Sequence, residues 1–129
     1  MAVVLIVEDD VFIRQVAEIM VEDIGYATLT ASDVAEALAF LEGAQSIDLL
    51  ITDIRLKSEA GGGYALARQA RILRPNLPVL YVTGSGPTEM EGQLVAGAHI
   101  LQKPYTQDQL QGAVELLFSE ILKTAAPVL

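Results

Sequence analysis

The sequence predicts a doubly wound α/β fold, in which five helices cover a five-stranded parallel sheet. Short apolar runs without polar alternation are typical of strands that are buried on both faces. Segments with apolar residues at helical spacing separate these runs, and the two patterns alternate along the whole chain. The chain has 129 residues, of which 52% are hydrophobic and 19% charged, as expected for one packed domain.

The first half of the chain contains three of the expected strands. The first covers residues 2–7 and stops at the acidic residues 8–10. A helix follows to about residue 24, where Gly25 supplies a C-terminal stop. One side of this helix is apolar, with Phe12, Ile13, Val16, Ile19, Met20 and Ile24.

The next elements repeat the alternation. A strand at residues 26–30 precedes a helix that Ser32 or Asp33 can cap, and a third strand at residues 48–52 ends at Asp53. A loop at Gly61-Gly62-Gly63 follows, and its glycines suggest mobility. After it we expect a helix through Tyr64 and Leu73, a strand at residues 79–82 and a weaker helix at residues 88–95. A strand at residues 98–101 and a final helix at residues 106–122 complete the chain of elements. We expect one domain at residues 1–123, followed by a short tail at residues 124–129.

The composition excludes several classes of function. Seventeen acidic and eight basic residues give a formal net charge of −9, which repels phosphate backbones and anionic membranes, so we expect neither nucleic-acid nor membrane binding. Without cysteine, disulfides, thiolate zinc sites and cysteine nucleophiles are excluded. The chain has neither an apolar run of about 18 residues nor the basic N-terminus of a signal peptide, and we expect a cytoplasmic protein.

Polar side chains follow the predicted strands at the points where they end. Glu8 and Asp9 follow the first strand, Asp53 ends the third, Thr83 the fourth, and Lys103 follows the fifth. The carboxyl ends of parallel strands lie along one edge of the sheet, where ligands bind in open α/β folds. We therefore expect these five side chains to lie close together.

Three carboxylates in one place need a cation, because a pair of like charges at about 4 Å costs about 4 kcal/mol at an effective dielectric constant near 20. Oxygen ligands favour Mg²⁺ over zinc or copper. A carboxylate nucleophile, a metal, a lysine and a hydroxyl group are the parts of a phosphoryl-transfer site. Asp53 is the expected nucleophile and would form an acyl phosphate.

Four segments of the chain resemble the signature segments of the bacterial response regulator receiver family, which includes the chemotaxis regulators. They are residues 5–10, 48–53, 82–84 and 103–105. Asp53 follows Asp9 by 44 residues, Thr83 follows Asp53 by 30, and Lys103 follows Thr83 by 20. The resemblance covers residues 3–122. It implies a flavodoxin-like sheet with strand order 2-1-3-4-5 in a stand-alone, single-domain receiver.

The resemblance also implies roles for the residues at the sheet edge. A histidine kinase or histidine phosphotransfer protein would phosphorylate Asp53. Glu8, Asp9, Asp53 and the backbone carbonyl of Arg55 would hold Mg²⁺. Thr83 would bond the phosphoryl group and Lys103 would pair with it.

The resemblance further implies a cis peptide bond between Lys103 and Pro104. A downstream protein would bind the face of the fourth helix, fifth strand and fifth helix, at about residues 88–122, and this face could also form a homodimer.

Ile100 and Lys57 depart from the family pattern, and Lys57 replaces a proline that is often found four residues after the phosphorylated aspartate. Ile100 stands where an aromatic residue usually takes part in switching, which puts that mechanism in question. Arg55 stands at a position that tunes dephosphorylation, and its side chain could shield the acyl phosphate from water, so we expect slow autodephosphorylation. His99 has no partner at recognisable spacing, and Arg68, Arg71 and Arg74 suggest a solvated helix face.

Three functions compete. The first is a phosphorylatable signalling protein that acts by binding partners and is not an enzyme beyond its own phosphorylation and dephosphorylation. The second is an Mg²⁺-dependent phosphohydrolase, although Arg55 stands where such enzymes usually carry a second acid. The third is a pseudo-receiver that binds partners without phosphorylation, an alternative that Ile100 keeps open.

Overall fold

The protein folds around a five-stranded parallel sheet with strand order β2-β1-β3-β4-β5, as predicted. The computed structural model describes residues 1–56, 62–84 and 94–125, with side chains as far as residue 120. The strands are β1 (Val3–Val7), β2 (Ala27–Ala31), β3 (Leu49–Asp53), β4 (Val79–Thr83) and β5 (His99–Gln102). In β1, β3 and β4 nearly every residue is buried, because helices cover both faces of the sheet.

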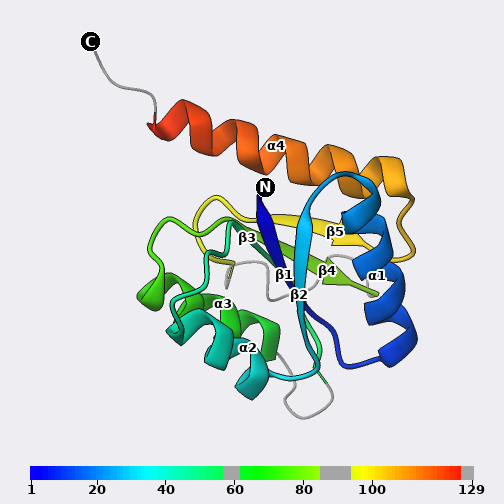
Figure 1. Ribbon diagram of the computed structural model, residues 1–129, viewed down its shortest axis with the longest axis horizontal. Helices are drawn as coiled ribbons and strands as arrows, with labels where there is room; N and C mark the ends of the chain where they lie inside the picture. The colour runs from blue at the N-terminus through cyan, green and yellow to red at the C-terminus, as the bar shows by residue number, and fades with distance from the viewer. Residues whose placement is uncertain (57–61, 85–93, 126–129) are drawn as a thin grey trace.

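Four helices form the outer layers in the part of the chain that the structure describes (Figure 1): α1 (Val11–Asp23), α2 (Val34–Glu42), α3 (Gly62–Leu73) and α4 (Gln107–Ala125). Buried side chains of α2 and α3 pack on one face of the sheet, and those of α1 and α4 pack on the other. The weaker helix expected at residues 88–95 falls mostly outside the described residues. Helix α4 continues three residues past the predicted end at residue 122.

Side chains cap the helices as the sequence indicates. Asp10 accepts hydrogen bonds from the backbone amides of Phe12 and Ile13 at 2.9 and 3.0 Å and thereby begins α1. Of the two candidates for the cap of α2, Asp33 accepts from the Glu36 amide at 2.8 Å. Gly25 has a φ of 102° just after α1, a conformation that glycine adopts without strain.

Most of the apolar side that the sequence shows on α1 lies away from the core. The side chains that face the core are Ala17 and Val21, whereas Phe12 is 75% exposed and Ile19 57% exposed. Ile13 and Val16 are also exposed. A small residue such as Ala17 lets the helix approach the sheet closely, and the larger apolar side chains are left on the surface.

The expected mobility of the glycine loop is wrong for two of its three residues. Gly62 and Gly63 are buried in the first turn of α3. A Cβ atom on Gly63 would lie 2.1 Å from the backbone oxygen of Asp53, so α3 approaches the end of β3 more closely than a side chain permits.

Several polar side chains have structural partners that the sequence did not reveal. His99 Nε2 lies 2.7 Å from Glu120 Oε1 and joins β5 to α4. Of Arg68 and Arg71 in α3 and Arg74 just after it, two are not simply solvated, since each donates to two backbone carbonyls. Arg71 donates to Leu77 and Ala96, and Arg74 donates to Leu41 and Gly43.

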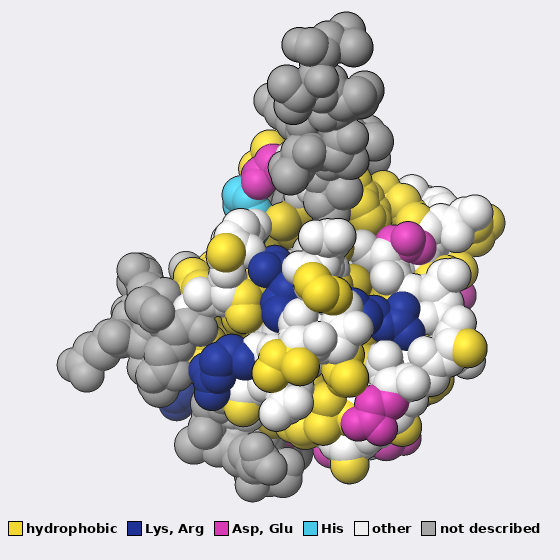
Figure 2. All heavy atoms as spheres, turned by 90° about the vertical axis from the view of Figure 1, so that its left-hand side faces the viewer, with side chains coloured by type: hydrophobic (Ala, Val, Ile, Leu, Met, Phe, Trp, Pro, Cys, Tyr) yellow, Lys and Arg dark blue, Asp and Glu magenta, His cyan; other side chains and the backbone are white. Residues whose placement is uncertain are grey.

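The surface charge is unevenly distributed. Figure 2 shows a face on which Lys and Arg side chains lie toward the middle among uncharged ones and Asp and Glu side chains lie around them, although the chain carries a net charge of −9. Within the described residues, every helix is too short or too polar to cross a membrane.

Candidate functional site

The predicted site residues lie at the carboxyl edge of the sheet. Asp53 is the last residue of β3 and Thr83 the last of β4, while Glu8 and Lys103 directly follow β1 and β5. The register pairs Val7 with Thr52 and Asp53 with Val82, so these strand ends are neighbours. Adjacent strands are about 4.8 Å apart, which brings residues distant in sequence within reach of one another.

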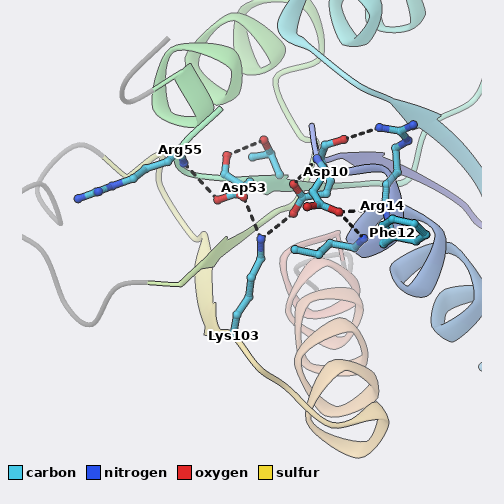
Figure 3. A network of polar contacts seen from close by, with 9 residues as sticks. Asp10, Phe12, Arg14, Asp53, Arg55 and Lys103 are labelled. Atoms are coloured by element: carbon cyan, nitrogen blue, oxygen red, sulfur yellow. Dashed lines mark hydrogen bonds and ion pairs between the residues drawn. The ribbon is translucent and has the colours of Figure 1, made fainter. Parts of the chain in front are cut away.

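Three carboxylates and one lysine meet at this edge, and Figure 3 shows Lys103 pointing to Asp53. Glu8, Asp9 and Asp53 each contribute a carboxylate oxygen, and these oxygens lie within 4.8 Å of one another. Lys103 Nζ lies 2.6 Å from Glu8 Oε1 and 2.9 Å from Asp53 Oδ2, and it donates to both. The second oxygen of Glu8 accepts from the amide of Asp10 at 3.0 Å.

The electrostatics of the site follow from burial. Glu8 is only 5% exposed, and desolvation raises the pKa of its carboxyl, with a smaller contribution from the charge of Asp53. Hydrogen bonds from Lys103 and Asp10 lower this pKa but do not outweigh burial. For Lys103, burial alone would lower the pKa, but the hydrogen bonds to Glu8 and Asp53 raise it, so the amine stays charged.

The donor set suits a divalent cation. Three carboxylates against one ammonium group leave a formal charge of −3 + 1 = −2, which Mg²⁺ would balance. Carboxylate oxygens at a partly exposed site are ligands that Mg²⁺ accepts, with water completing its coordination. The family resemblance of the sequence implies Mg²⁺ in an acidic pocket of this kind, and the residues present fit that ion.

The other predicted site residues take different positions. The amide of Arg55 donates to Asp53 Oδ1 at 3.2 Å, while its exposed side chain points away from the carboxylate cluster (Figure 3). Thr83 is buried, and its carbonyl accepts from the amide of Lys103 at 2.8 Å. The peptide bond between Lys103 and Pro104 is cis.

An apolar groove lies beside the carboxylate cluster. It has a volume of about 300 Å³ and is lined by Phe12, Ile13, Val16, Met20, Lys103, Pro104 and Tyr105. Ile13, Lys103 and Tyr105 also line the small pocket at Asp53, so the groove and the site share a wall. Sequence analysis missed this groove. The exposed apolar residues of α1 and the segment after Lys103 are 90 positions apart, and nothing local relates them.

Arg14 was also missed as a site residue. Its Nη1 donates to the backbone carbonyl of Glu8 at 2.9 Å. The sequence showed Arg14 only as a polar residue outside the apolar side of a helix, because a bond to a carbonyl leaves no signal in residue types.

Comparisons with known proteins agree with this geometry. The family model described as the response regulator receiver domain matches residues 4–115. The C4-dicarboxylate transport transcriptional regulatory protein DctD of Rhizobium meliloti is 33% identical over 109 residues, which are 83% of this chain and 23% of that protein. The uncharacterized transcriptional regulatory protein YbdJ of Bacillus subtilis is 29% identical over 83% of this chain and 46% of its own length. The chain thus spans less than half of these curated relatives.

Two solved structures share the fold over nearly their whole length. A response regulator receiver protein from Sinorhizobium medicae WSM419 is 31% identical with a TM-score of 0.86, and the match covers 93% of this chain and 96% of that one. A response regulator receiver domain protein (CheY-like) from Methanospirillum hungatei JF-1 is 28% identical with a TM-score of 0.84, covering 97% and 99%.

Proposed function

The chain belongs to the response regulator receiver family, and from this premise we propose that Asp53 accepts a phosphoryl group from the phosphohistidine of a partner protein. The donor is a histidine kinase or a histidine phosphotransfer protein. Phosphorylation then changes which proteins the chain binds. The observation that carries this proposal is the hydrogen bond from Lys103 Nζ to Asp53 Oδ2, which lies in the cluster of three carboxylates.

The reaction is a displacement at phosphorus. A carboxylate oxygen of Asp53 forms a bond to phosphorus while the bond from phosphorus to the imidazole nitrogen of the donor breaks, and the imidazole leaves with the electron pair. Lys103 pairs with the transferred phosphoryl group, and the Thr83 hydroxyl donates to one of its oxygens. Glu8, Asp9, Asp53 and the Arg55 carbonyl would hold Mg²⁺, which supplies positive charge that offsets the charge of the phosphoryl oxygens.

Mass spectrometry after incubation with Mg²⁺ and acetyl phosphate tests this proposal. We expect a gain of one phosphoryl group that is lost in Asp53→Asn. Asp10→Asn is the matched control, because it removes the same charge from an acidic residue outside the three-carboxylate cluster and keeps a residue that caps a helix. An unmodified wild type would favour the pseudo-receiver, and rapid turnover of phosphate esters would favour the phosphohydrolase.

We infer that the apolar groove beside Lys103 receives the phosphodonor protein. A segment seated against Phe12 and Val16 lies next to Asp53, because Ile13, Lys103 and Tyr105 line both the groove and the site. Large apolar side chains exposed together on a surface mark protein-binding sites. The exposure of Phe12 therefore serves recognition of the donor.

The test compares two exposed apolar residues. Phe12 on α1 is 75% exposed and Ile72 on α3 is 73% exposed, so replacing either with serine has little effect on packing. With the kinase that phosphorylates the wild type fastest in a purified panel, we expect about tenfold slower transfer to Phe12→Ser, since a central apolar contact is worth about 1–2 kcal/mol. Acetyl phosphate should modify both variants like the wild type. Equal rates of phosphoryl transfer to the two variants would show that the groove does not bind the phosphodonor protein.

The output surface remains the one expected from the sequence, at about residues 88–122, of which the structure describes residues from 94 onward. In this part Ile100 is 39% exposed and Leu116 is 49% exposed, and both are available to a downstream protein or a second copy. Analytical ultracentrifugation with and without phosphorylation distinguishes these two partners. Slow autodephosphorylation and the cytoplasmic location stay predictions.

A further inference from the structure

Arg14 joins the first turn of α1 to the end of β1. Its half-buried side chain extends back across the loop of residues 8–10, and Nη1 donates to the carbonyl of Glu8 at 2.9 Å (Figure 3). The pairing of β1 with both neighbouring strands ends at Val7, so this carbonyl lies beyond the sheet ladder. Arg14 therefore supplies a hydrogen bond where the regular backbone pairing stops.

The loop of residues 8–10, to which Arg14 donates this hydrogen bond, carries two of the three clustered carboxylates, those of Glu8 and Asp9. Two of its backbone groups bond to the elements around it. The amide of Glu8 donates to the carbonyl of Ala31 at 3.1 Å, and the Asp10 carbonyl accepts from the amide of Arg14 at 2.9 Å. The side-chain bond from Arg14 holds the intervening peptide, which sets the direction in which the acidic side chains leave the backbone.

We propose that Arg14 is a positioning residue for Mg²⁺, which holds Glu8 and Asp9 in the arrangement that binds the ion. This inference rests on the proposed function of the carboxylate cluster. Groups that orient metal ligands typically contribute a factor of about 10–100 to metal affinity. We expect Arg14→Met to weaken Mg²⁺ binding about tenfold.

Electrostatics alone predicts the opposite sign. The guanidinium is a cation near a site for a cation, and its removal should strengthen Mg²⁺ binding by relieving like-charge repulsion. The two effects of Arg14 can therefore be told apart by the direction of the change in affinity. A guanidinium that acted only through its charge would give a tighter-binding variant.

Isothermal titration calorimetry of the full chain with MgCl₂ tests the proposal. The variants are Arg14→Met, Arg14→Lys and Arg68→Met, and the last is the matched control because exposed Arg68 carries the same charge. We expect about tenfold weaker binding for Arg14→Met, an intermediate loss for Arg14→Lys, whose amine keeps the charge but has shorter reach, and a change below about twofold for Arg68→Met. Melting temperatures in EDTA establish that each variant is folded.

Equal or tighter Mg²⁺ binding by Arg14→Met would overturn the proposal. Should Arg14→Met not fold, Arg14→Lys decides, and wild-type affinity in that variant would also overturn it. Phosphorylation of the wild type by acetyl phosphate is measured separately. If the wild type is phosphorylated and the Arg14 variants bind Mg²⁺ normally, only the role of Arg14 fails. A wild type that does not bind Mg²⁺ would overturn both proposals.

Discussion

The contact between Gly63 and Asp53 allows a strict test of how α3 supports the site. A Cβ atom on Gly63 would lie 2.1 Å from the Asp53 oxygen, 2.7 Å from Ile54 Cα and 2.9 Å from the Asp53 carbonyl carbon. All three atoms belong to the backbone, so no side chain can turn aside. Because real Cβ contacts are essentially never shorter than 3.0 Å, α3 and the end of β3 must separate by at least 3.0 − 2.1 = 0.9 Å.

This separation should be costly in Gly63→Ala. The Gly63 amide donates to the Ile54 carbonyl at 3.0 Å, and a shift of the helix strains that bond as well. Overpacking that moves backbone typically costs about 1–3 kcal/mol. Because all three contacts here are with backbone, we expect the upper end, about 3 kcal/mol, which in a chain of this size lowers the melting temperature by about 10 °C. The same movement displaces Asp53, so the fraction that stays folded should be phosphorylated more slowly.

Thermal unfolding followed by circular dichroism, together with phosphorylation by acetyl phosphate at 10 °C, measures both effects. Gly112→Ala is the control, because an added Cβ on Gly112 in α4 would have no described atom within 4 Å apart from the backbone of its own helix. Alanine there should raise the stability by up to about 1 kcal/mol through its helix propensity. A Gly63→Ala variant that melted within 2–3 °C of the wild type, about 1 kcal/mol, would refute the reasoning.

Three further predictions concern single polar contacts. Tyr81→Phe removes the hydroxyl that accepts from the Val95 amide at 3.2 Å, and urea unfolding should show a loss of about 1 kcal/mol; an unchanged midpoint would contradict this. In EDTA, the free energy of unfolding should fall as the pH rises through the raised pKa of Glu8, because the folded state holds the proton of the Glu8 carboxyl more tightly than the unfolded state. Urea titrations between pH 4 and 8 should show this fall in the wild type and a weaker fall in Glu8→Gln. His99→Gln, which removes the partly exposed contact with Glu120, should cost less than about 1 kcal/mol, and a melting point lowered by 10 °C would disprove this.

Local sequence patterns predicted much of the fold. A strand buried on both faces leaves a continuous apolar run, as in residues 3–7 and 49–51, and each run ends where polar residues begin. Capping by Asp10 and Asp33 was readable because it depends on residues only two or three positions away. Convergence of the site followed from topology, since parallel strands bring their carboxyl ends to one edge.

Local sequence patterns did not predict which side of α1 packs against the sheet. Helical periodicity identified an apolar side, but the helix carries a second set, Ala17 and Val21, and this second set faces the sheet. The larger side chains of Phe12 and Ile19 remain in solvent. The choice between the two sets depends on how closely the helix can approach the strands, which is a property of the assembled layers.

Local order along the chain was thus enough to predict the sheet, its parallel strands and the carboxylate cluster with its lysine, because each depends on residue type and on where a strand ends. Only the folded chain revealed the hydrogen bond from Arg14 to Glu8, the contact of Gly63 with Asp53 and the groove beside Lys103. These features depend on distances between atoms of separate elements, and packing decides such distances after the elements have formed.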